Sequence, residues 1–323
     1  MSRIHSLRYA AAVVLAATLT LCAQPPTGGR GGPQPEYARQ AQQLIRDGKM
    51  DEALAVYQKE LAANPNSPMA NNAAGTLLDL MGRGGEARKY FQKAIDGAAD
   101  AAAKANGQRA LAMSFAFEGD CRNTVKYEQM AIAYWVTREP AEPQNAFYQE
   151  GELANEGARV CIDAGDLETA ETWYRKGTEM GLKEPGSATH PASLWRFRME
   201  HALGRLAARR GDKAEARKHV AAAQALLASD PKMAEQQARF LPYLAGYVAL
   251  YTGDTQTALT ELQKAIGMQG NGMDPFLQCL LGMTYEKLGA QEKAIECYRK
   301  AGATTAHNPP AAFARPFARK KLG

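Results

Sequence analysis

The sequence predicts an all-α protein, an α-solenoid of about seven helical hairpins followed by a C-terminal capping helix. Helix-forming residues dominate the 323-residue chain, and only 8% of its residues are aromatic. Runs of β-branched residues are nearly absent after the first twenty positions, which favours helices over strands. The chain also repeats one spacing: seven glycines recur along it, and six of them are followed five residues later by alanine.

These glycines define a frame that is shared by all seven units. They are Gly48, Gly82, Gly119, Gly165, Gly211, Gly253 and Gly289. Seven positions before each glycine the residue is Ala or Gly, and nine positions after it the residue is apolar except at Glu128. Offsets of three, four and seven residues mark one face of a helix. Each unit therefore predicts two amphipathic helices, with the glycine as the left-handed turn between them.

The pattern resembles the tetratricopeptide repeat (TPR). The segment "LLGMTYEKLGAQEKAIECYRKA" carries it at Leu281, Gly282, Tyr285, Ala294, Tyr298 and Ala301, and residues 36–65 carry it as well. The resemblance covers most of residues 34–308 and implies about seven stacked TPR-like hairpins. It also implies a non-enzymatic scaffold or adaptor for protein–protein interaction, since one hairpin cannot bury its own faces and stacked hairpins present a concave surface.

The N-terminus has the layout of a secretory signal peptide. In "MSRIHSLRYAAAVVLAATLTLCAQPP", Arg3 and Arg8 precede a short apolar run and then small residues. We expect a signal peptide over residues 1–23, a flexible leader over 24–33, and a periplasmic or secreted bacterial protein. A lipid anchor on Cys22 is the alternative, and it would make the chain a membrane-anchored envelope-assembly lipoprotein. Leu21 argues against it, because a small residue normally precedes the acceptor cysteine.

Glycine spacings of 34, 37, 46, 46, 42 and 36 residues show that the middle of the array is expanded. Pro-containing stretches at 136–147, 183–191 and 229–236 are the expected linkers, although longer helices would also absorb the extra length. Residues 309–323 are expected to cap the array as a helix with an apolar stripe. A basic tail that binds a membrane or a partner is the alternative interpretation of the same segment.

Four cysteines lie outside the signal peptide: Cys121, Cys161, Cys279 and Cys297. Their spacing matches no zinc or redox motif, and their disulfide state is left open by the sequence. Cys121 begins the second helix of the third unit, and Cys161 lies near the end of the first helix of the fourth. Because these helices should be antiparallel neighbours, a disulfide between Cys121 and Cys161 is geometrically allowed.

No catalytic or metal-binding motif is recognisable, so we expect neither an enzyme nor a cofactor. His190, His219 and His307 are expected to be solvated surface residues. Without Arg3 and Arg8 the chain has 37 basic and 34 acidic residues, a balance that does not indicate nucleic-acid binding. An enzyme or small-ligand binder with a site assembled from several repeats remains an alternative, because catalytic groups can converge from distant units.

The resemblance also places the partner-binding groove. In the family, inward-facing residues lie ten, six and three positions before each glycine. The groove residues predicted here, with their flanking aromatics, are Arg109, Asn155, Arg159, His201, Arg205, Tyr243, Tyr247, Tyr251 and Phe276. Arginine binds carboxylates and tyrosine offers a rigid contact surface, so we expect a protein or peptide with an acidic part followed by an apolar part. In this interpretation Arg205 and Tyr247 are exposed. Alternatively, the three tyrosines pack against the expanded linkers.

Overall fold

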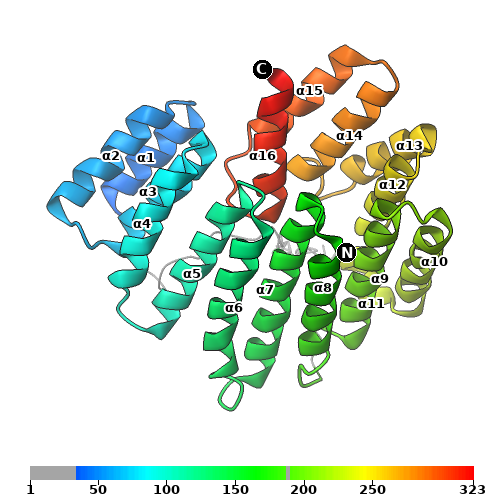
Figure 1. Ribbon diagram of the computed structural model, residues 1–323, viewed down its shortest axis with the longest axis horizontal. Helices are drawn as coiled ribbons and strands as arrows, with labels where there is room; N and C mark the ends of the chain where they lie inside the picture. The colour runs from blue at the N-terminus through cyan, green and yellow to red at the C-terminus, as the bar shows by residue number, and fades with distance from the viewer. Residues whose placement is uncertain (1–33, 187–189) are drawn as a thin grey trace, which may run out of the picture.

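The computed structural model describes residues 34–186 and 190–323, which form sixteen helices and no strand (Figure 1). The first helices of seven successive hairpins are α1 (Glu36–Arg46), α3 (Pro68–Met81), α5 (Ala101–Ala116), α7 (Pro143–Ala164), α9 (Ala192–Arg209), α12 (Phe240–Tyr251) and α14 (Pro275–Lys287). The second helices are α2 (Met50–Ala63), α4 (Gly84–Asp96), α6 (Cys121–Val136), α8 (Leu167–Gly181), α10 (Lys213–Ser229), α13 (Thr255–Gly267) and α15 (Gln291–Gly302). The predicted all-α solenoid is confirmed, while the predicted signal peptide, leader and Cys22 anchor lie outside the described residues.

The seven anchoring glycines all have positive φ, between 70° and 91°, and each ends a first helix. Only glycine adopts this conformation without strain, which explains its recurrence. In four hairpins the next residue is an aspartate whose side chain accepts a hydrogen bond from the backbone N–H three residues later. These N-caps are Asp120, Asp166, Asp212 and Asp254. A Gly-Asp pair thus both stops one helix and starts the next.

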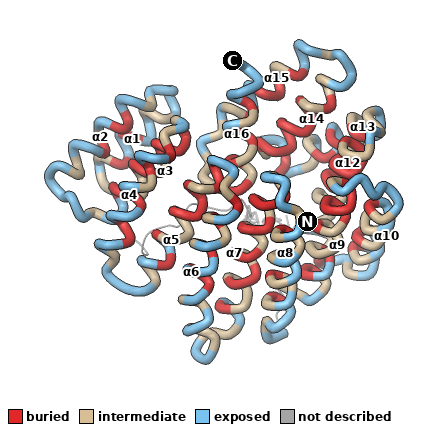
Figure 2. Tube along the Cα trace, viewed as in Figure 1, coloured by how far each residue is buried: buried red, intermediate tan, exposed pale blue. Residues whose placement is uncertain are grey.

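In each of two hairpins, a glycine in the first helix packs against a large aromatic side chain from the second helix. A Cβ added at Gly282 would lie 2.5 Å from the Tyr298 ring, and one added at Gly75 would lie 2.8 Å from the Phe91 ring. Tyr298 and Phe91 are almost fully buried there. Figure 2 shows that buried positions recur along the helices. Close approach at glycine therefore sets the spacing within these hairpins.

The extra length in the middle of the array is absorbed in more than one way. Helix α7 begins inside the predicted linker 136–147 and runs for 22 residues. Residues 229–236 are not an irregular linker but contain most of a short helix, α11 (Pro231–Gln237), which is capped by Asp230. Here the proline stands at the first turn of a helix, where its missing N–H has no cost.

Cys121 and Cys161 form a disulfide bond, with their Cα atoms 4.7 Å apart. It links the start of α6 to the last turn of α7. Cys279 and Cys297 are free and buried. The disulfide therefore joins two adjacent hairpins.

The last helix, α16 (Pro309–Leu322), contacts both the final repeat and repeats earlier in the array. It packs on α14 and α15, as a capping helix would, and it also contacts α5 and α7. Arg315 is buried, and its Nε donates a 2.7 Å hydrogen bond to the carbonyl of Leu80 in α3. Figure 1 shows α16, in red, between the first repeats and α14. The solenoid thus curves round until its C-terminal helix reaches the second repeat.

His307, which precedes α16, also links this end of the chain to the second repeat. It is largely buried, whereas the sequence predicted a solvated surface residue. Its side chain is only 9% exposed, and its Nε2 lies 2.8 Å from a carboxylate oxygen of Asp79. Its ring also stacks on Phe117 at 5.1 Å between centroids. Burial results from the long-range closure, which local composition does not reveal.

Candidate functional site

Four of the nine predicted groove residues are buried. Tyr247, Phe276, Arg205 and Tyr243 are 0%, 1%, 4% and 4% exposed. The exposure that we expected for Arg205 and Tyr247 is therefore not observed. Arg205 contacts Tyr174 and Tyr243, and both Tyr243 and Tyr247 pack against Phe276. The guanidinium of Arg159 in α7 also lies 4.7 Å from the ring centroid of Phe276 in α14, three repeats away. A large part of the predicted groove is therefore buried in the interior of the protein.

The structure brings most of these residues together in one group, which we call the interior arginine cluster. Its polar members are Arg159, Asp163, His201, Arg205 and Arg209, and its aromatic members are Tyr174, Tyr243, Tyr247, Tyr251 and Phe276. Helices α7 and α9 supply the charges, and α8, α12 and α14 supply the rings. The three tyrosines contact arginines, and Tyr243 and Tyr247 also belong to the hydrophobic cluster that contains Met233 of the predicted linker at 229–236.

Aromatic side chains, not carboxylates, hold the arginines in place. Arg205 donates hydrogen bonds to the hydroxyls of Tyr174 and Tyr243, and its guanidinium lies 5.9 Å from the ring centroid of Tyr247. Arg209 lies 5.0 Å from the ring centroid of Tyr251. Cation–π contacts fix the position of a guanidinium without neutralising its charge. The arginines are therefore held by aromatic contacts and keep their positive charges.

Burial and charge shift the pKa values of the other two polar members. Burial lowers the pKa of His201 well below its usual range, and the charges of Arg205 and Arg159 add to the effect. This histidine is neutral at pH 7. Burial raises the pKa of Asp163 to about 6, although Arg159, Arg205 and Arg209 oppose the shift. Asp163 thus compensates the three arginines only in part, and Asp274 also acts on Arg159.

Several polar atoms of the cluster have no hydrogen-bond partner within the described residues. They are Nε and Nη2 of Arg159, Nε of Arg205, Nε2 of His201 and Oδ2 of Asp163. Buried donors without acceptors are uncommon and unfavourable in folded proteins. Arg159 as a whole residue is partly exposed, whereas its unpaired Nε and Nη2 are buried. These features make Arg159 and Arg205 the main candidates for ligand contact.

Two predicted groove residues lie apart from the cluster. Arg109 is paired with Glu156 through Nε and Nη2, so its charge is already compensated. Asn155 contacts α8, where its amide oxygen would lie 2.6 Å from a Cβ built at Gly177. Both are partly exposed. Neither residue therefore adds an unpaired positive charge to the interior arginine cluster.

Sequence reasoning did not single out Asp163, Arg209 and Tyr174. Asp163 and Arg209 stand two positions before their glycines, one helical turn after Arg159 and Arg205. Residues four apart share a helix face, so the same periodicity would have indicated them. Tyr174 lies on a second helix, and only the packing shows that it reaches Arg205.

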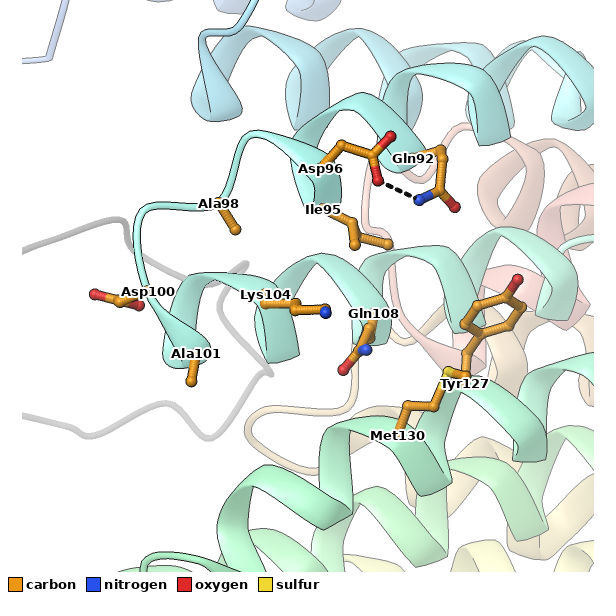
Figure 3. A pocket seen from close by; sticks show the side chains of 10 residues that line it. All are labelled: Gln92, Ile95, Asp96, Ala98, Asp100, Ala101, Lys104, Gln108, Tyr127 and Met130. Atoms are coloured by element: carbon orange, nitrogen blue, oxygen red, sulfur yellow. Dashed lines mark hydrogen bonds between the residues drawn. The ribbon is translucent and has the colours of Figure 1, made fainter.

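A second candidate surface is a pocket between α4, α5 and α6. Its lining residues are Gln92, Ile95, Asp96, Ala98, Asp100, Ala101, Lys104, Gln108, Tyr127 and Met130 (Figure 3). Gln92 donates a 2.7 Å hydrogen bond to Asp96 on its rim, and no buried polar atom of its lining residues lacks a partner within the described structure. This pocket therefore offers less chemistry for a specific ligand than the interior arginine cluster does.

The described residues show neither a metal site nor a membrane span. They contain no group of three or more His, Cys, Asp or Glu side chains arranged to hold a metal ion. Across residues 34–186 and 190–323, none of the helices is both long and apolar enough to cross a membrane.

Known proteins place the chain among helical repeats. Two family models described as tetratricopeptide repeat match residues 39–113 and 277–301. No curated protein sequence matches it significantly.

Similar solved structures include a tetratricopeptide repeat protein from Parabacteroides merdae, at 16% identity over 89% of this chain and 96% of that one, with a TM-score of 0.44. The apo form of RapI is 10% identical over 88% of this chain and 97% of its own, with a TM-score of 0.46. The P58(IPK) TPR domain is 16% identical over 88% of both chains, with a TM-score of 0.32.

Proposed function

Because the chain is a tetratricopeptide repeat protein, we propose that it is a non-enzymatic scaffold that binds a segment of a partner protein on its concave side. Tetratricopeptide repeats support a role in protein–protein interaction, and stacked hairpins offer an extended surface for it. The finer proposal is that the partner segment carries an acidic part followed by an apolar part.

The observation that carries this proposal is the partly exposed Arg159. Its Nε and Nη2 have no acceptor within the described residues, and the ring of Phe276 lies against its guanidinium. His201 and Tyr251 are partly exposed members of the same cluster. A carboxylate beside an apolar side chain matches this combination of a cation and aromatic rings.

The test uses Arg159→Gln and Tyr251→Ala, which avoid the buried Arg205 and Tyr247. A partner is captured from cell-envelope extract with the full chain and purified, and its affinity is then measured by calorimetry. A true hot spot costs about 2 kcal/mol or more, which is roughly a thirtyfold loss of affinity. Arg175→Gln is the matched control, since Arg175 on α8 is 60% exposed and paired with Glu171. Wild-type affinity in both variants would move the binding site to another surface.

We also propose that the chain is exported, on the basis of the signal-peptide layout of residues 1–23. The Cys121–Cys161 disulfide supports an oxidising compartment. Mass spectrometry of the mature protein tests this proposal and also separates it from lipid anchoring. A mature chain that begins near residue 24 is expected. An intact Met1, or a lipid mass on Cys22, would contradict it.

A further inference from the structure

We propose that the interior arginine cluster is a binding site for a single oxyanion, held by the guanidinium groups of Arg159 and Arg205. The inference rests on the proposed function and deepens it, because the oxyanion is expected to be a carboxylate of the partner segment. Free inorganic phosphate presents the same chemistry to two guanidinium groups and is the competing source.

The first argument is the balance of charge. Arg159, Arg205 and Arg209 all act electrostatically on Asp163, and Asp274 at the start of α14 also acts on Arg159. Three cations therefore face two carboxylates. His201 contributes no compensation, since it cannot become negative. Arg109, by contrast, has its own carboxylate in Glu156. The cluster therefore retains an excess of positive charge that an oxyanion would neutralise.

Donor geometry provides the second argument. Arg205 uses Nη1 and Nη2 on tyrosine hydroxyls, which leaves its buried Nε without an acceptor. Arg159 stacks on Phe276 and leaves both Nε and Nη2 without one. The Nε and Nη2 of one guanidinium form the planar fork that binds two oxygens of a carboxylate or phosphate. In Arg159 both nitrogens of this fork, Nε and Nη2, are available to an oxyanion. The Nε of Arg205 is a third available donor.

Preorganisation is the third argument. The side chain of Arg205 is 4% exposed and is fixed by Tyr174, Tyr243 and Tyr247. A ligand that binds here does not have to order a flexible arginine, so little of the binding free energy is lost. The surrounding rings also exclude water, which strengthens the attraction between opposite charges.

The test follows the two arginines directly. The full chain is labelled with ¹⁵N-arginine, and the Nε–H signals of Arg159 and Arg205 are recorded during titration with glutarate or with inorganic phosphate. Sodium chloride keeps the ionic strength constant. We expect saturable shifts of both signals with glutarate, and weaker ones with phosphate. Saturation by phosphate alone would support the oxyanion site and reject the partner carboxylate as its ligand.

Variants separate a specific site from general ion effects. Arg159→Gln is expected to weaken the saturable shift of Arg205 at least tenfold, while Arg175→Gln leaves it unchanged. Arg159→Lys keeps the charge but lacks the planar fork, so it should also bind more weakly, and it serves if the glutamine variant folds poorly. Shifts that are absent, linear with concentration, or equal in wild type and Arg159→Gln would overturn the proposal.

The two proposals can fail separately. If glutarate binds at Arg159 but the purified partner binds Arg159→Gln with wild-type affinity, the oxyanion site stands and the proposed partner contact fails. If the partner depends on Arg159 but neither anion saturates the signals, the scaffold proposal stands and the oxyanion site is rejected.

Discussion

Single residues with no side chain decide how closely the helices of a hairpin approach. Gly282 is the clearest case, because a Cβ there would lie 2.5 Å from the Tyr298 ring. Replacing Gly282 with leucine should lower the free energy of unfolding by at least about 1–3 kcal/mol, as overpacked cores do. Urea denaturation followed by circular dichroism measures the change. Gly267→Leu is the control, since nothing lies within 4 Å of a Cβ at that exposed position. Equal stability of the two variants would contradict the packing described here.

Glu150 is a buried acid whose protonation should make stability depend on pH. Burial raises its pKa from 4.5 to about 7, and the neighbouring Glu139 adds to the shift, while Lys183 and Lys176 oppose it. The folded state therefore binds the proton more tightly than the unfolded chain does. Its contribution to stability is greatest below pH 4.5, falls as the pH rises toward about 7, and is then constant.

Glu150→Gln should remove this dependence. The variant's melting temperature minus that of the wild type is expected to increase from pH 5 to pH 8, by about 1–2 °C for each kcal/mol of relieved penalty. Differential scanning calorimetry at several pH values gives this difference, and Glu179→Gln, at an exposed position on α8, controls for the loss of one charge. A difference that stays constant with pH would show that Glu150 titrates normally.

For single residues, the sequence predicted the position of a side chain within the repeat better than it predicted whether that side chain is exposed to solvent. The spacing rule gave Arg205 and Tyr247 the same position in adjacent repeats, and in the structure the Arg205 guanidinium lies 5.9 Å from the Tyr247 ring centroid. It did not predict that both are buried, because Arg205 contacts Tyr174 of the preceding hairpin and Tyr247 stacks on Phe276 of the following one. Helix periodicity gives the direction of a side chain and not what it meets there.

At the scale of elements, the disulfide between α6 and α7 joins two repeats covalently. Thiol counting under denaturing, non-reducing conditions should find two free thiols among the four cysteines from 121 onward, namely those of Cys279 and Cys297. Reduction should lower stability by about 2–4 kcal/mol, since the bond closes a long loop. A double variant, Cys121→Ala with Cys161→Ala, controls for other effects of the reductant and should not respond to it. Four reactive thiols in the untreated protein would contradict the bond.

Helices and turns were the part of the fold most open to prediction. All seven glycines end helices because each needs a left-handed backbone conformation that other residues adopt poorly. The expanded regions were harder, since a proline is compatible with both a linker and the first turn of a helix. Pro231 begins α11 and Pro143 begins α7 within stretches that were expected to be linkers.

On the scale of the whole molecule, Arg315 joins the C-terminal end of the array to its second repeat. It donates hydrogen bonds to the carbonyl oxygens of Leu80, Gly302 and Thr304. Arg315→Met should leave these acceptors unpaired and cost about 2 kcal/mol or more. Hydrogen exchange should become faster in α16 and at the C-terminal end of α3. Lys320→Met, on the exposed side of the same helix, is the control and should exchange as the wild type does. Unchanged exchange in Arg315→Met would show that the closure does not depend on this residue.

The curvature that produces this closure could not be predicted from the sequence. The repeat frame describes how each hairpin packs on the next, but small rotations between neighbours add up along the array and decide where its end arrives. The apolar stripe of residues 309–323 indicated a helix that covers the last repeat. Nothing local indicated that its opposite side would meet Leu80, Met113 and Val160.

The bond between His307 and Asp79 spans 228 residues, and that between Arg315 and Leu80 spans 235. An open solenoid tolerates the gain or loss of a unit, since each unit meets only its neighbours. Here a unit added between residues 80 and 303 would carry α16 away from its acceptors, and a unit removed would drive it past them. The contacts of α16 are therefore compatible with only one number of repeats between residues 80 and 303. Repeat duplication, the usual way for such arrays to grow, would break these contacts if it occurred in that region.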